Sequence, residues 1–246
     1  MLPRHALAAS TLLTSAPADP PPSRGHLLLE TSLVSGAALV ILAGVARLGP
    51  TWPGSWLAPS AVLLAAALLP TLLQRRSLAQ LGLRHSRDLA SSLVWFALTA
   101  LVVLAGVVLA LSTLHYLRLQ PPLVPNVPRA QWPPWLAFQL LYVAPAEELF
   151  FRGYLTTNLL HLCAPLFPAR AGWQRWAAIA GSAAAFTLAH VAVSGAALSA
   201  LTFLPGLILG WLFVRTRCLL APVLLHAFAN AAWAWAPCLA SGWSVP

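Results

Sequence analysis

Long apolar runs, separated by short polar or proline-rich segments, follow one another along most of the chain. A helix needs about 20 mostly apolar residues to cross ~30 Å of hydrocarbon. Seven runs approach or exceed this length and none alternates like a half-buried strand; they cover residues 27–47, 56–73, 89–114, 135–160, 174–193, 197–214 and 219–238. Because a helix satisfies its own backbone hydrogen bonds in lipid, the pattern predicts an all-α, polytopic integral membrane protein with about seven transmembrane helices.

The amino-acid composition agrees with this class of protein. Hydrophobic residues make up 59% of the chain and charged residues 8%, whereas soluble domains average roughly 45–50% and about 25%. Together with a mean hydropathy of +0.78, these values exclude a water-soluble globule, a disordered tail and a disulfide-stapled secreted domain. The three cysteines lie far apart without C-x-x-C spacing, so we expect them to pack as small apolar residues.

Two segments interrupt the apolar pattern and divide the chain. Residues 1–26 are polar and proline-rich, which predicts a flexible N-terminal segment. Residues 118–134 contain six prolines and are predicted to form a loop on the membrane surface. The first three transmembrane helices are then expected within residues 27–117, and a second transmembrane core within residues 135–240.

The distribution of arginine predicts how the chain is inserted. The net charge of +9 comes from fourteen arginines, without any lysine. Ten arginines lie in the N-terminal segment or near the connections after the second, fourth and sixth runs, and three lie on the opposite side. Because basic residues accumulate on the cytoplasmic side, we expect a cytoplasmic N-terminus and interpret these arginines as topology signals, not as a nucleic-acid interface. The arginine-only, alanine- and leucine-rich composition is typical of a GC-rich bacterial genome and therefore predicts the inner (plasma) membrane.

Carboxylates are scarce: of the five, Glu30 lies at the edge of an apolar run, and Glu147 and Glu148 lie well inside one, together with Arg152. Each charge at the centre of a span costs about 2.5–3.5 kcal/mol, so three cost roughly 8–10 kcal/mol before any pairing. Glu148 and Arg152 are four residues apart and can pair on one helix face. A buried ion pair that fixes helix packing would explain these two residues. It would not explain Glu147, which lies about 100° around the helix and is left free to act as a general base.

Two later runs contribute histidines. His190 lies near the end of the fifth run, and His226 precedes Asn230 by four residues in the seventh, so these two share a helix face. A single histidine on an apolar helix is more often a packing residue. Two histidines in a membrane protein that also buries an unpaired glutamate are candidates for a functional site.

In this order, the three motifs resemble the CAAX protease and bacteriocin-processing (CPBP, or ABI) family of intramembrane proteases. They are Glu147-Glu148-x-x-x-Arg152, Phe186-x-x-x-His190 and His226-x-x-x-Asn230, and with their flanking residues they cover 145–232. The resemblance implies an intramembrane endopeptidase with its active site inside the helix bundle, so that residues 135–240 form the catalytic transmembrane core. It also implies a protein or peptide substrate that enters from the lipid bilayer and is cleaved near a membrane-proximal or C-terminal end.

The resemblance further implies a role for each candidate residue. Glu147 and His190 would position and deprotonate the attacking water, with the neighbouring glutamate–arginine pair in support. His226 and Asn230 would stabilise the oxyanion of the tetrahedral intermediate. No cofactor is expected in this version; the alternative is one zinc ion bound by Glu147, His190 and His226, with a fourth position open for water.

Two functions from other classes remain open. A membrane transporter or proton relay also uses buried glutamate, histidine and arginine. A catalytically silent scaffold or bacteriocin-immunity protein of the same family would retain the motifs without the reaction. Other intramembrane protease chemistries explain less, because the chain has no H-E-x-x-H motif and no aspartate in an apolar run.

Overall fold

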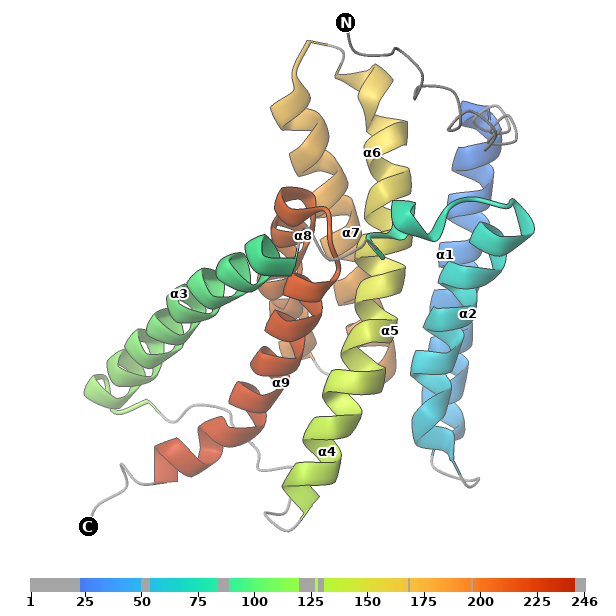
Figure 1. The fold of residues 1–246 in the computed structure, drawn as a ribbon. Helices are drawn as coiled ribbons and strands as arrows, with labels where there is room; N and C mark the ends of the chain where they lie inside the picture. The colour runs from blue at the N-terminus through green and yellow to red at the C-terminus, as the bar shows by residue number, and fades with distance from the viewer. Residues whose placement is uncertain are drawn as a thin grey trace, which may run out of the picture.

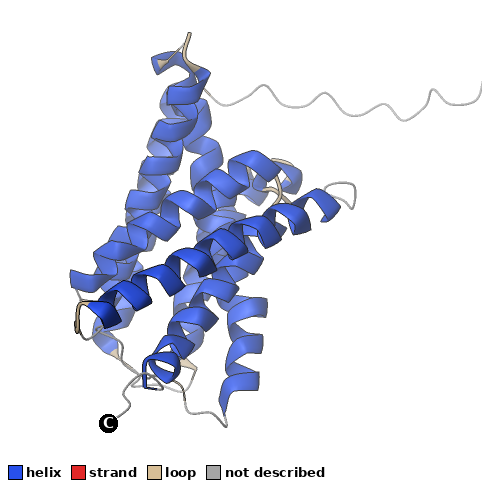
Figure 2. Ribbon diagram, turned by 90° about the vertical axis from the view of Figure 1, so that its left-hand side faces the viewer, coloured by secondary structure: helices blue, strands red, loops and turns tan. Residues whose placement is uncertain are grey.

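The computed structural model describes residues 23–49, 54–83, 89–119, 127, 131–167, 169–195 and 197–241. Within these ranges the chain forms helices and short connections without any strand, so the predicted all-α class is confirmed (Figure 2). Residues 1–22 of the predicted N-terminal segment, and most of the predicted loop at 118–134, lie outside the described residues.

The first half of the chain supplies three long helices. They are α1 (Arg24–Leu48), α2 (Ala58–Leu73) and α3 (Leu89–Tyr116), with the short turns η1 (Ser55–Leu57) before α2 and η2 (Leu78–Leu81) after it. Helices α1 and α2 lie side by side on one flank of the molecule, and α3 runs obliquely along the opposite flank (Figure 1).

The second half opens with one continuous helical course, which begins inside the predicted loop. It consists of α4 (Trp132–Phe138), η5 (Gln139–Val143), α5 (Ala144–Glu148), η6 (Leu149–Thr156) and α6 (Thr157–Cys163), and η5 and η6 are π-helical. Prolines at positions 133 and 134 occupy the first turn of α4, where proline is tolerated. Short π-helical stretches within α-helices are rare and occur frequently at functional sites.

Three further helices pack around this course. They are α7 (Ala171–Ser194), α8 (Phe203–Thr216) and α9 (Leu220–Ser241), with η7 (Ala164–Leu166) before α7 and η8 (Ala197–Thr202) before α8. Helix α7 contacts α1, α6 and α8, and α9 contacts α3, α5 and α8. The course from α4 to α6 therefore runs between the α1–α2 pair and the α3–α9 pair (Figure 1).

Five helical segments among the described residues are long and apolar enough to cross a membrane. They are Arg24–Leu48, Ser55–Leu73, Leu89–Tyr116, Ala171–Ser194 and Ser199–Thr216. The two other predicted runs, 135–160 and 219–238, are also helical, but the first is divided by the π-helical stretches and the second carries polar residues. Helices therefore form where each of the seven runs predicts one, and the number of seven membrane spans stays a prediction.

The core of the bundle is built around η6, whose eight residues are all buried. Phe150, Phe151 and Tyr154 of this stretch pack with Phe186 of α7 and with apolar side chains of α1 and α2. Many large apolar side chains on the outside of the bundle are exposed, and they cover most of α3. This distribution is expected where lipid, and not water, surrounds the helices.

A largely buried carboxylate, that of Glu30 in α1, connects the N-terminal helices to the core. Its Oε2 atom accepts hydrogen bonds from Arg76 Nη2 at 2.7 Å and Gln74 Nε2 at 2.8 Å. Its Oε1 atom accepts one from the hydroxyl of Tyr154 in η6 at 3.0 Å. Hydrogen bonds to a charged acceptor are stronger than neutral ones, so this cluster fixes α1 and the end of α2 against the central helix.

Glycines allow helices to approach each other closely at three positions. An added Cβ at Gly206 of α8 would lie 3.1 Å from the Cβ of Ala183, and one at Gly210 would lie 3.0 Å from Ile179 Cγ2, both on α7. At Gly153 of η6 it would lie only 2.7 Å from the backbone oxygen of Leu81. Small residues of this kind let membrane helices pack tightly.

Replacing Gly153 by alanine is expected to destabilise the protein, because the new methyl group meets backbone that cannot rotate away. Overpacking of this kind costs typically 1–3 kcal/mol. The matched control is Gly44→Ala in α1, where an added Cβ has no atom within 4 Å and alanine favours the helix by roughly 0.5–1 kcal/mol. Thermal unfolding in detergent checks this: Gly153→Ala should melt below the wild type and Gly44→Ala at or above it. Equal melting temperatures for the two variants would contradict the expected contact.

Candidate active site

Three of the predicted site residues, each from a different helix, converge at one point. Glu147 of α5 directs its Oε2 atom towards His226 of α9, whose Nε2 atom lies 3.6 Å away. The Nε2 atom of His190, on α7, lies 3.9 Å from the same oxygen. Each of these residues lies more than 30 positions from the next one along the sequence. The fold brings all three into one cluster.

Glu148 and Arg152 form the ion pair that their spacing predicts. Arg152 Nη1 donates to Glu148 Oε1 at 3.0 Å, and both side chains are completely buried. The second terminal nitrogen of Arg152 donates to the backbone oxygen of Gly206 in α8 at 3.3 Å. The guanidinium carbon also lies 4.5 Å from the ring centroid of Phe186, a cation–π distance. These contacts offset part of the cost of removing two charges from water.

The same oxygen of Glu148 also contacts His226, which the sequence analysis did not foresee. His226 Nδ1 lies 2.7 Å from Glu148 Oε1, and the histidine side chain is 5% exposed. A distance of 2.7 Å is typical of a hydrogen bond in which at least one partner is charged. Glu148 therefore joins Arg152 and His226 in one buried network, and its role is broader than the predicted pairing with arginine.

The contacts of the two histidines fix their hydrogens. His190 Nδ1 lies 2.9 Å from the backbone oxygen of Phe186. Because a carbonyl oxygen only accepts, Nδ1 of His190 must carry a hydrogen. The same reasoning places a hydrogen on His226 Nδ1, which faces the Glu148 carboxylate. In the neutral imidazoles, both Nε2 atoms therefore present lone pairs towards Glu147 Oε2.

The cluster around Glu147 consequently contains three acceptors that face one another. Glu147 Oε2 is buried and has no hydrogen-bond partner among the described residues. Its separations of 3.6 and 3.9 Å from the two nitrogens are too long for direct hydrogen bonds. Contacts of this length between polar atoms suit a bridging water, which can donate two hydrogens. The geometry therefore fits a single water molecule between the glutamate and the histidines.

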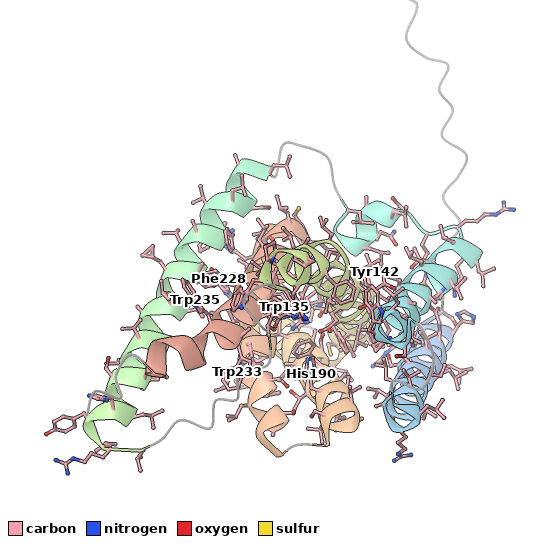
Figure 3. The ribbon with its side chains drawn as sticks, turned by 90° about the horizontal axis from the view of Figure 1, so that it is seen from below. Trp135, Tyr142, His190, Phe228, Trp233 and Trp235 are labelled. Atoms are coloured by element: carbon pink, nitrogen blue, oxygen red, sulfur yellow. The ribbon has the colours of Figure 1, made fainter. Side chains whose placement is uncertain are left out.

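Exposure decreases from one side of the cluster to the other. The side chain of His190 is 34% exposed and that of Glu147 is 16% exposed, whereas His226 and the Glu148–Arg152 pair are closed off. Figure 3 views the bundle from the end where α4 begins, and labels Trp135, Trp233 and Trp235 on the α3 side of His190. The cluster is thus reached from the side of His190, and the charged network lies behind it.

Asn230 lies one turn beyond His226 on α9 and contacts a residue that the sequence analysis missed. Its Nδ2 atom donates to Gln139 Oε1, in η5, at 2.8 Å. No motif marks Gln139, but it is a polar residue inside the apolar run 135–160, and this signal was available in the sequence.

A zinc ion held by Glu147, His190 and His226 would need their ligand atoms at short distances from one another. Tetrahedral ligands at 2.0–2.1 Å from zinc lie about 3.3 Å apart, which is shorter than both distances from Glu147 Oε2. Among the described residues, no group of three or more His, Cys, Asp or Glu side chains is arranged to hold a metal ion. In this arrangement the three side chains would have to move closer together to hold zinc, so both the metal-free version and the zinc alternative stay predictions.

The segment that contains this cluster is similar to a known protease family. Residues 129–232 match the family model described as Rce1-like, type II CAAX prenyl endopeptidase. The matched segment contains all six predicted site residues and also Gln139, and the predicted resemblance to CPBP proteases is confirmed. Neither the curated proteins nor the solved structures gave a significant match.

Replacing Glu148 by glutamine is expected to lower stability and activity together, because it removes the charge that Arg152 and His226 share. Breaking a buried pair by removing one partner costs about 3–5 kcal/mol. The matched control is Glu147→Gln, which removes a neighbouring carboxylate that has no hydrogen bond at Oε2. Thermal unfolding in detergent should show a clear loss for Glu148→Gln and little change for Glu147→Gln. A Glu148→Gln protein that melts with the wild type would refute the network.

Proposed function

We propose that this integral membrane protein is an intramembrane endopeptidase. It hydrolyses a peptide bond near the membrane-proximal or C-terminal end of a protein or peptide that enters from the bilayer. The match to the Rce1-like family supports this class of activity, and the apolar helices support the membrane setting. The single observation that carries the mechanism is the convergence of two histidine Nε2 atoms on Glu147 Oε2.

In the proposed reaction, Glu147 is the general base. A water molecule between Glu147 and the histidines donates one hydrogen to His190 Nε2 and the other to the Glu147 carboxylate. As its oxygen attacks the carbonyl carbon of the substrate, the O–H bond towards Glu147 breaks and the carboxylate takes the proton. Collapse of the tetrahedral intermediate breaks the C–N bond, and the leaving amine takes that proton from Glu147. General base catalysis typically contributes 10²–10⁴-fold to the rate.

The oxyanion of the intermediate is stabilised by His226 and Asn230. Side chains are needed for this task, because the N–H groups within transmembrane helices already bond to their own backbone. His226 Nδ1 is bound to Glu148, so Nε2 is the nitrogen available to the oxyanion. It donates to the oxyanion when the imidazole is protonated. Removing one oxyanion donor typically lowers kcat by about 10²–10³-fold.

The substrate and the membrane location belong to the same proposal. CAAX processing needs a prenylated C-terminal cysteine, so in a bacterium we expect a different C-terminal or leader segment as the substrate. We place the N-terminus in the cytoplasm because of the arginine distribution, and the protein in the inner membrane because its composition is typical of a bacterial genome.

Replacing Glu147 by glutamine is expected to abolish proteolysis, with a loss of at least 10²-fold, because the general base is removed. Comparison of the membrane proteomes of wild type and variant should reveal substrates that stay full-length at their C-termini in the variant. Identical proteomes, together with an unimpaired cellular phenotype in Glu147→Gln, would contradict the protease and favour a silent scaffold. If Glu147→Gln alters ion or proton flux but leaves the C-termini of all membrane proteins unchanged, the result would favour a transporter.

Metal removal provides a separate test of the water-activation step. The purified wild type in nanodiscs, assayed with a peptide covering a cleavage site found above, should keep its rate within about twofold after dialysis against a zinc chelator. Glu147→Gln in the same assay sets the inactive baseline. A chelated enzyme that falls to this baseline and recovers with added Zn²⁺ would replace the proposed metal-free mechanism with the zinc alternative.

A further inference from the structure

The only side-chain partner that the described residues provide for Asn230 is Gln139. The Asn230 Nδ2 atom donates to Gln139 Oε1 at 2.8 Å, and both residues are half-buried. The contact connects α9 with η5, at positions 91 residues apart in the chain. Gln139 carries no charge, and within the described part of the chain its side chain forms no hydrogen bond with a predicted site residue other than Asn230.

The π-helical stretch explains how Gln139 reaches this position. Glu147 follows Gln139 by eight residues, which in an α-helix would place the two about 80° apart around the axis. Residues 139–143 are π-helical, and hydrogen bonds that span five residues wind the chain less per residue than those that span four. The slower winding turns Gln139 towards the helix face of Glu147, and hence towards α9.

The contact with Gln139 determines which end of the Asn230 amide can face a substrate. Asn230 has two N–H donors on one side of its amide and an acceptor oxygen on the other. Rotation by 180° about χ2 exchanges them, and an oxygen directed at the oxyanion would repel it. With one N–H bonded to an acceptor on Gln139, the other N–H of the same nitrogen remains free to donate.

We propose that Gln139 is a positioning residue, which fixes the Asn230 amide so that its nitrogen faces the developing oxyanion. This inference rests on the proposed function, because it requires Asn230 to be an oxyanion donor. Gln139 itself does not touch the reacting atoms. It acts only through Asn230, so its effect on kcat should disappear when Asn230 is replaced. A residue that merely supports the fold would not show this dependence.

The test is a double-mutant cycle in nanodiscs with the peptide substrate, measuring kcat and KM for Gln139→Met, Asn230→Ala and the double variant. Methionine keeps the length of the side chain but offers no strong acceptor. We expect Gln139→Met to lower kcat about tenfold with KM within twofold, a smaller loss than removal of the donor itself. In the Asn230→Ala background, Gln139→Met should change kcat by less than twofold. Gln139→Glu, which keeps an acceptor, should retain more activity than Gln139→Met.

A matched control comes from Gln174 of α7, whose Nε2 donates to the backbone oxygen of Leu160 at 2.9 Å, away from the cluster. Gln174→Met should leave kcat unchanged, whatever its effect on the melting temperature. A wild-type kcat in Gln139→Met, or an equal loss with and without Asn230, would overturn the positioning role. If Asn230→Ala itself keeps the wild-type kcat, the oxyanion assignment fails as well. If Glu147→Gln is inactive while Gln139→Met keeps the wild-type kcat, only the positioning role of Gln139 is overturned, and the proposed protease activity stands.

Discussion

A charged carboxylate buried among transmembrane helices is the constraint on which the rest of the structure depends. Glu148 is completely buried, and an ionised group in that position is tolerated only where it is paired and hydrogen-bonded. Arg152 from its own helix and His226 from α9 both bind its Oε1 atom. Because Arg152 also donates to the backbone of α8 and lies against Phe186 of α7, one carboxylate specifies how four helices meet.

The same constraint gives the adjacent glutamates different environments. Glu148 is occupied by its two partners, whereas the Oε2 atom of Glu147 faces the Nε2 atoms of two histidines and has no hydrogen-bond partner among the described residues. His226 links the two environments, since its Nδ1 contacts Glu148 and its Nε2 points to Glu147. The buried network therefore determines the orientation of that ring and the nitrogen that faces Glu147.

Sequence reasoning was most successful where a structural feature depends on local spacing. Helices form at every predicted apolar run, and the Glu148–Arg152 contact follows from a separation of four residues. Contacts between helices have no such spacing, so the bond from His226 to Glu148 and that from Asn230 to Gln139 could not be derived. The π-helical stretches were missed as well, because nothing in an apolar run indicates where a helix changes its winding. Composition likewise predicts apolar runs better than it predicts how many of them cross the membrane.

Small residues and charged residues are interdependent in this bundle. The backbone oxygen of Gly206 accepts a hydrogen bond from Arg152, and an added Cβ at this glycine would lie 3.1 Å from Ala183 on α7. A larger residue would push α8 away from α7, and the guanidinium would lose an acceptor that lipid cannot replace. Close apolar packing is therefore a condition for satisfying the buried arginine. The arginine in turn binds Glu148 beside His226, so packing far from the reacting atoms contributes to the arrangement of the charged groups in the site.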